Sequence, residues 1–272
     1  MKNHKEKIKD SIEKNVNIMN TPFMAILPGQ IAFFVVLSII PLASIIMMIL
    51  SNLPINIVRI SNALYNYIPP VINKLLIQIL NEQSVGALDV LFIITAFYLA
   101  SKATHSIIVA STRIYNGKQT DFIRTRIKAI IILIILVFLA LLLVGVLTIG
   151  SRLVIYFSGI NGSLHPALNT IYSILKWPFV MFMIFFTVKV VYTIAPNVKI
   201  PSKSVNRGSL VTTVVWVIST YAFSFYVSKI ANYSKFYGNL SNLIILMIWI
   251  YWQCYIFVYG MSLNEYALNR EN

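Results

Sequence analysis

Lys102 and His105 are ionisable side chains within an otherwise apolar stretch of this 272-residue sequence. Their spacing would place both side chains on one face of a helix. A lysine at the centre of a membrane-spanning helix costs about 2.5–3.5 kcal/mol on insertion scales, so its presence calls for a reason. Two interpretations stay open: the pair binds an anionic group such as a lipid phosphate, or Lys102 contacts a backbone carbonyl, Glu265 or water.

Arg152 and Lys176 are two further cations, placed near the expected outer ends of apolar stretches. Together with Lys102, His105 and Glu265 they form the set that we predict to contact a charged substrate. The alternative for Arg152 and Lys176 is that their long side chains extend along the helix to the membrane interface.

Three prolines, Pro28, Pro41 and Pro178, also lie inside apolar stretches. Proline removes a helical hydrogen bond and clashes with the preceding turn, which predicts kinks or breaks at these positions. Inside a membrane, the freed backbone groups need neighbouring helices or a ligand as partners.

The residues that could form a catalytic or metal site are few and scattered. The chain has eight acidic residues and three histidines, and His4, His105 and His165 fall in the N-terminal tail, an apolar stretch and a predicted outer loop. No glycine-rich phosphate loop or Ser/His/Asp order is present. The single cysteine, Cys254, lies in an apolar stretch and is expected to be a core residue. We therefore predict no enzyme, no metal and no cofactor.

The elements that must position these residues are membrane-spanning helices. Hydrophobic residues make up 58% of the chain, charged residues 11%, and the mean hydropathy is +0.79. Long charge-free intervals separate Lys14 from Arg59 and Lys128 from Arg152, and two more run from Arg207 to Lys229 and from Lys235 to Glu265. Each can hold a helix of about 20 residues, the length that crosses a bilayer. The predicted fold class is an all-α integral membrane bundle of about six helices.

The predicted organisation has a cytoplasmic amphipathic segment at 1–22, a six-helix transmembrane domain at 23–268 and a tail at 269–272. Two short amphipathic helices are expected in the first outer loop. The predicted spans are 23–50, 87–115, 129–156, 167–195, 208–230 and 240–266.

Orientation follows from the lysines and arginines, since short cytoplasmic loops carry an excess of these residues. They cluster before the first span, after the second and after the fourth, which predicts that both termini are cytoplasmic. The formal charge of +14 arises at helix ends rather than on a basic groove, so we predict anionic lipid headgroups as partners and no nucleic acid. The abundance of Ile, Lys and Asn is typical of an AT-rich bacterial genome, which predicts a bacterial cytoplasmic membrane; the oligomeric state stays open.

Several motifs resemble those of the YihY/BrkB family of bacterial membrane proteins, some of which carry the older label ribonuclease BN. The matching segments are LSIIP (Leu37–Pro41), STRIY (Ser111–Tyr115), YTIAPN (Tyr192–Asn197), RGSL (Arg207–Leu210), FYGNLSNLIILMIWIY (Phe236–Tyr251) and GMSLNEYAL (Gly260–Leu268). The motif positions singled out are Pro196, Asn197, Gly208, Tyr237, Gly238, Trp249 and Gly260.

Two positions depart from the family pattern. Arg113 replaces an asparagine, and Ser262 replaces a glutamate, with Glu265 as the nearest carboxylate on nearly the same helical face. The resemblance implies a six-helix bundle, with transport of lipids or lipid-linked molecules as the leading function. The sequence has no nucleotide-binding motif, which predicts movement of such anionic molecules without ATP hydrolysis. A non-transporting scaffold or assembly factor is the alternative, and a tRNA-processing ribonuclease is disfavoured.

Overall fold

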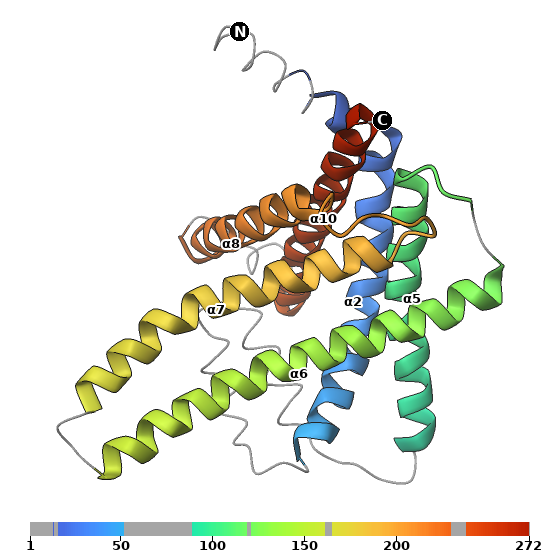
Figure 1. Cartoon of the computed structure of the whole chain (residues 1–272). Coiled ribbons are helices and arrows are strands. Elements are labelled where there is room, and N and C mark those ends of the chain that lie inside the picture. Colours follow the sequence, from blue (N-terminus) through green and yellow to red (C-terminus); the bar gives the residue numbers. More distant parts are fainter. Residues whose placement is uncertain are drawn as a thin grey trace, which may run out of the picture.

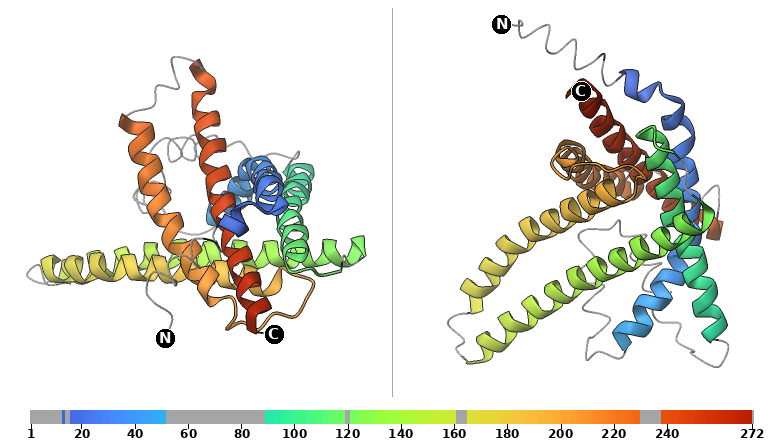
Figure 2. Two further views of the ribbon diagram at one scale, coloured as in Figure 1. Left: turned by 90° about the horizontal axis from the view of Figure 1, so that it is seen from above. Right: turned by 45° about the vertical axis from the view of Figure 1, so that its right-hand side comes forward.

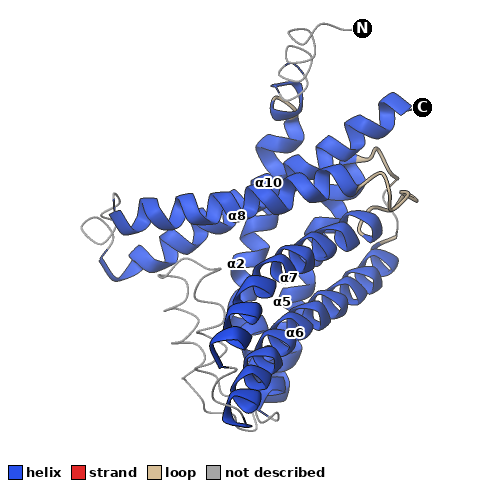
Figure 3. Cartoon of the chain, turned by 60° about the vertical axis from the view of Figure 1, so that its left-hand side comes forward, coloured by secondary structure: helices blue, strands red, loops and turns tan. Residues whose placement is uncertain are grey.

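The computed structural model describes residues 13, 16–51, 89–118, 121–160, 165–229 and 238–271. These residues form helices joined by short loops, and no strand occurs among them (Figure 3). The predicted all-α membrane bundle is confirmed. The helices are α2 (Pro22–Ser51), α5 (Asp89–Ile114), α6 (Phe122–Ile160), α7 (His165–Ile194), α8 (Asn206–Lys229) and α10 (Ser241–Glu271), with the short 3-10 helix η2 (Gly238–Leu240) before α10 (Figure 1).

Five of these helices are long and apolar enough to cross a membrane within the described residues. The segments are Pro22–Ile39, Phe122–Val154, Asn169–Ile194, Asn206–Lys229 and Leu243–Leu268. Helix α5 is not among them. Its hydroxyl residues are buried against the other helices, so α5 faces the interior of the bundle; they are Ser101, Thr104, Ser106, Ser111 and Thr112.

The ends of the helices have local causes. Helix α5 stops where Asn116 adopts a left-handed φ of 51° and the Gly117 N–H donates to the Thr112 carbonyl at 2.8 Å, a common way to close a helix. Helix α7 ends just before Pro196, which cannot continue the hydrogen-bonding pattern.

The three prolines that predict kinks or breaks lie within continuous helices. Helix α2 runs through Pro28 and Pro41, and α7 runs through Pro178. Figure 2 shows that α2 is bent along its length, so the lost hydrogen bonds are accommodated by curvature.

The helices pack as a bundle in which α2 contacts both α5 and α10. Helices α6 and α7 form an antiparallel pair, and α8 packs against α7 and α10. The view from above in Figure 2 shows α2 and α5 nearly end-on, while α6 and α7 lie across the view. The α6–α7 pair is therefore strongly inclined to α2 and α5.

The beginning of α2 and the end of α10 lie at the same end of the molecule (Figure 1). The connections after α5 and after α7 lie close together there, with Gly117 packed against the Val198 side chain. This places the basic segments after the second and fourth predicted spans beside each other, while the cytoplasmic orientation of that end stays a prediction. Residues 1–12, 14 and 15 of the predicted N-terminal segment, the amphipathic helices of the first outer loop and Tyr237 lie outside the described residues.

Candidate functional site

Lys102 lies on α5 against two aromatic rings rather than against a carboxylate. Its Nζ is 5.0 Å from the centroid of the Tyr98 ring and 6.0 Å from that of Phe34 on α2. In the described part of the chain, no ion pair or hydrogen bond to this ammonium group occurs. The electron-rich faces of the rings stabilise the cation in part, and they leave it able to meet an anion.

Arg126, near the start of α6, faces the same Tyr98 ring. Its guanidinium carbon is 4.5 Å from the ring centroid, and Nη2 donates to the Tyr98 carbonyl at 3.4 Å. His105 lies one turn of α5 beyond Lys102, within electrostatic reach of Arg126 and with its ring 6.4 Å from that of Phe122. The structure thus brings Lys102 and His105 together, as their spacing predicts, and adds Arg126.

The crossing of α5 and α6 positions this cluster. Thr104 is buried, and its hydroxyl donates to the Ala129 carbonyl on α6 at 2.8 Å. Ala129 is itself buried, so small side chains let the two helices approach. Lys102 and His105 flank Thr104 in the sequence and are only partly covered.

The other charged residues of the predicted substrate set do not join Lys102. Arg152 lies 26 residues after Arg126 on the same helix, which corresponds to about 39 Å along the axis. Lys176 lies on α7 one turn beyond Tyr172, whose hydroxyl donates to the Leu147 carbonyl, so it is also far from Arg126. Glu265 lies near Tyr115, at the end of α5 about 20 Å from Lys102.

A cavity of about 390 Å³ lies between the helices. This is within the range of about 300–1,000 Å³ that is usual for small-ligand sites. Every long helix of the bundle contributes to its walls. The lining residues are Ile31, Val35, Ile107, Leu136, Trp177, Ile184, Thr187, Val188, Val191, Trp216, Val217, Thr220, Tyr221, Trp249, Ile250, Gln253, Cys254 and Phe257.

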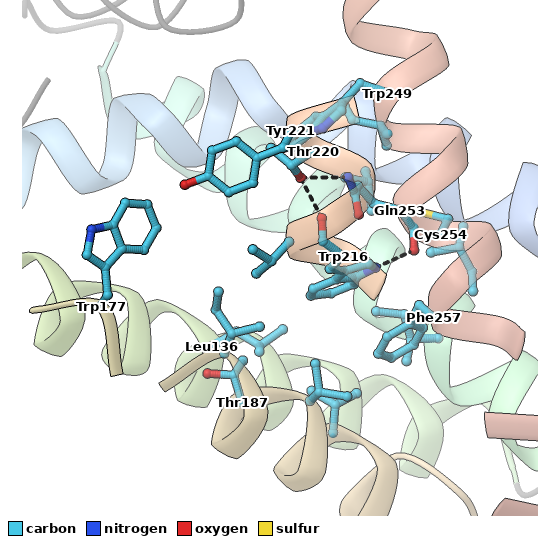
Figure 4. Close-up of a pocket in the computed structure, with 18 residues that line it drawn as sticks. Leu136, Trp177, Thr187, Trp216, Thr220, Tyr221, Trp249, Gln253, Cys254 and Phe257 are labelled. Atoms are coloured by element: carbon cyan, nitrogen blue, oxygen red, sulfur yellow. Dashed lines mark hydrogen bonds between the residues drawn. The ribbon is translucent and has the colours of Figure 1, made fainter. Parts of the chain in front are cut away.

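The wall of the cavity is mostly apolar, and a hydrogen-bonded polar cluster lies in it between α8 and α10 (Figure 4). The Trp216 indole N–H donates to the Gln253 carbonyl at 2.8 Å, and Gln253 Nε2 donates to the Thr220 hydroxyl at 3.1 Å. Trp177 lies on the opposite wall, from α7. Cys254 is buried as predicted and also contributes to this wall.

Trp249, one of the motif residues, lines the cavity and has a buried side-chain donor. Its indole Nε1 is buried, and it has no hydrogen-bond partner among the described residues. A buried donor without an acceptor costs about 1–3 kcal/mol. Such groups in native proteins call for an explanation, of which a ligand oxygen or an ordered water is one.

The motif glycines Gly208 and Gly260 mark the closest approach of α8 and α10. A Cβ on Gly208 would overlap the Gly260 carbonyl and the Asn264 amide, and a Cβ on Gly260 would overlap the Thr212 and Tyr192 hydroxyls. Asn264 is fully buried, and its Oδ1 accepts from the Gly208 N–H at 2.7 Å. It thereby caps one of the N–H groups that the first turn of α8 leaves without a helical partner.

Two further motif residues, Pro196 and Asn197, are held by a lysine. Lys128 Nζ donates to the Pro196 carbonyl at 2.7 Å and to Asn197 Oδ1 at 2.9 Å. The Asn197 N–H donates to the Thr112 hydroxyl at 3.2 Å. The motif residues at this end of the bundle therefore join α5, α6, α7, α8 and α10. Gly238 starts η2 with a left-handed φ of 51°, as a turn position requires.

Sequence reasoning missed several of these residues because their partners are distant in the chain. Arg126 and Lys128 entered the prediction only as charges that set orientation, and Gln253 and Asn264 were not singled out. The position where the family has glutamate, Ser262, is buried and bonded to the Val258 carbonyl. Within the described ranges, no three His, Cys, Asp or Glu side chains gather as a metal site would require.

Comparison with known proteins places this geometry in context. The family model described as "Virulence factor BrkB" matches residues 24–272. A protein of Bacillus subtilis (strain 168), named "Putative ribonuclease-like protein YfkH", is 28% identical over 251 residues, which cover 89% of this chain and 90% of that relative.

More distant relatives are named for their membrane location. The "UPF0761 membrane protein" of Yersinia pestis (strain Pestoides F) and "UPF0761 membrane protein YpsIP31758_0030" of Yersinia pseudotuberculosis (serotype O:1b, strain IP 31758) are each 23% identical over 155 residues. The match spans 55% of this chain and about half of theirs, 53%. No solved structure matches the chain.

Proposed function

Because this chain belongs to the Virulence factor BrkB family of membrane proteins, we propose a transport role for it, the movement of lipids or lipid-linked anionic molecules across the membrane. The observation that carries the proposal is the apolar cavity enclosed by α2, α5, α6, α7, α8 and α10. A cavity of this kind inside a helical bundle suits an acyl chain, and the Gln253 cluster offers polar contacts at its wall.

The proposed mechanism needs no catalytic residue. An apolar chain would enter between the helices, and the cluster of Trp216, Thr220 and Gln253 would meet the polar part of the molecule as it passes. The sequence has no nucleotide-binding motif, so the movement would be passive or coupled to an ion gradient. The cell membrane, with both termini in the cytoplasm, is the location that goes with this proposal.

The experiment is a lipid-movement assay in proteoliposomes with a variant that fills the cavity. Val217 on α8 lines the cavity, whereas Val214 on the same helix is exposed on its surface. Val217→Phe should reduce the rate of movement of labelled phosphatidylglycerol several-fold, because the larger ring occupies the space that the acyl chain would use. Val214→Phe makes the same change outside the cavity and should leave the rate near that of the wild type.

Two outcomes would contradict the proposal. One is a folded Val217→Phe variant that moves lipid as fast as the wild type, and the other is a reconstituted wild type that moves no lipid. The second outcome would favour the scaffold alternative, in which the hydrogen bonds around Gly208, Gly260 and Asn264 serve helix packing alone.

A further inference from the structure

A basic and aromatic cluster lies on the outside of the bundle where α5 meets α6. It consists of Tyr98, Lys102, His105 and Arg126. The Tyr98 ring lies between two helices' cations, 5.0 Å from Lys102 Nζ and 4.5 Å from Arg126 Cζ. Two cations that share one ring repel each other, so an anion placed beside the ring would stabilise the arrangement.

The carboxylates of the described chain do not supply that anion. The basic groups of the cluster form no ion pair there, and the ion pair next to them joins Asp121 to Arg124 at 3.8 Å. Both members of that pair are exposed, with 81% and 80% of their side chains accessible. Lys102, His105 and Arg126 are by contrast partly buried, so their charges are less screened by water.

The start of α6 sets the depth of the cluster in the membrane. Arg124, Arg126 and Lys128 lie in its first two turns, and no charged residue follows until Arg152. The basic turns from Arg124 to Lys128 therefore mark the level at which α6 enters the hydrocarbon, which is the level of the lipid headgroups. Lys102 shares a ring with Arg126 and must lie near this level, which removes the cost of a lysine at mid-membrane.

The surroundings distinguish a lipid from a free ion. Tyr98 is 53% exposed, and Phe122 and Ile123 beside the cluster are 72% and 71% exposed. These apolar side chains border the cationic groups on the outer surface of the bundle. A soluble anion would leave these apolar side chains exposed, whereas the acyl chains of a phospholipid would cover them.

We propose that Tyr98, Lys102, His105 and Arg126 bind the phosphate of an anionic phospholipid from the surrounding leaflet. Phosphate is the group that arginine and lysine recognise together, arginine through paired N–H donors and lysine as a compact charge. The site is separate from the cavity, and binding at it does not require that the protein transports anything. Its test can therefore fail or succeed independently of the transport proposal.

The experiment measures retention of phosphatidylglycerol by the purified full-length protein, with phosphatidylcholine as the uncharged reference. The variant carries Lys102→Gln and Arg126→Gln, and the matched control is Arg124→Gln, which removes an exposed arginine from the same helix. Each cation near a membrane surface contributes about fivefold in affinity for anionic lipid. The double variant should therefore retain phosphatidylglycerol more than tenfold less strongly. Arg124→Gln removes one exposed arginine that is paired with Asp121, so its retention should fall by less than the fivefold of one free cation.

Competition with inorganic phosphate identifies the source of the anion. A lipid site should keep its phosphatidylglycerol in millimolar phosphate, because the apolar border also contributes to binding. Displacement of the lipid by phosphate, or equal retention by wild type and double variant, would overturn the proposal. If the double variant unfolds, the Arg126→Lys protein takes its place, because it keeps the charge and loses the paired donors. It should retain phosphatidylglycerol to an intermediate degree. Retention equal to that of the wild type would also overturn the proposal.

Discussion

At the scale of single residues, Tyr192 connects three helices at the motif-rich end of the bundle. It is fully buried, and its hydroxyl lies 2.6 Å from the Phe257 carbonyl and 2.8 Å from the Thr212 hydroxyl. One phenolic group thus joins α7, α8 and α10.

Replacing Tyr192 with phenylalanine should lower the stability of the protein by about 1–3 kcal/mol, since the buried Phe257 carbonyl loses its side-chain donor. Thermal unfolding in detergent, followed by size-exclusion chromatography, would measure the change. Tyr221→Phe, which alters a half-exposed ring on α8, serves as the control and should unfold at nearly the wild-type temperature. Equal unfolding temperatures for Tyr192→Phe and the wild type would show that the hydroxyl adds nothing to stability.

The neighbours of Lys102 could be predicted from the sequence only in part. The spacing of Lys102 and His105 correctly predicts a shared location, because three residues along a helix define a face. It does not predict Arg126 as their neighbour, since that contact depends on how α6 crosses α5. The predicted set also included Arg152 and Lys176, which the length of α6 and the pairing of α7 with α6 keep far from Lys102.

At the scale of elements, the crossing of α8 and α10 depends on two glycines. Gly260→Ala would place a methyl group against the hydroxyls of Thr212 and Tyr192, so the helices must separate. We expect a loss of stability of about 1–3 kcal/mol, as for other overpacked cores.

Gly145 on α6 provides the matched comparison for Gly260. A Cβ at Gly145 meets no atom within 4 Å. Because alanine favours a helix over glycine by about 0.5–1 kcal/mol, Gly145→Ala should be neutral or stabilising. The measurement compares the unfolding temperatures of the two alanine variants in the same detergent. A Gly260→Ala protein as stable as Gly145→Ala would contradict the close packing of α8 on α10.

The bounds of the elements were largely predictable, because long charge-free intervals in a membrane protein define helices. The prediction for α7, 167–195, lies close to the observed His165–Ile194. The prediction for α6 began at 129, seven residues late, because the basic residues before it were assigned to a linker. Arg124, Arg126 and Lys128 instead occupy the first turns of the helix, since a membrane interface accepts basic side chains within a continuous helix.

At the scale of the whole molecule, sequence patterns predicted the fold class but not the cavity. Side chains from six helices, which span most of the chain, line the cavity. Its shape depends on the inclination of α6 and α7 relative to α2 and α5 (Figure 2). Lipid-facing and cavity-facing residues are both apolar, so hydropathy does not separate them. By residue type alone, Trp177, Trp216 and Trp249 fit a position at the membrane interface as well as they fit the cavity wall.

The charge-free part of α6 is longer than the hydrocarbon core of a bilayer is thick. Between Lys128 and Arg152 the helix has 23 residues, or about 35 Å of length, against about 30 Å of hydrocarbon. A helix with this excess must incline or thicken the lipid around it. Since α7 is paired with α6 and lines the cavity, the inclination of the pair should vary with bilayer thickness.

Membrane thickness would then act as a mechanical input to this protein. In proteoliposomes made from lipids of increasing chain length, we expect α6 and α7 to become steeper and the rate of lipid movement to change progressively. Spin-label distances between α6 and α2 would report the inclination independently of any transport. Unchanged distances across the series would mean that the surrounding lipid deforms while the bundle stays rigid.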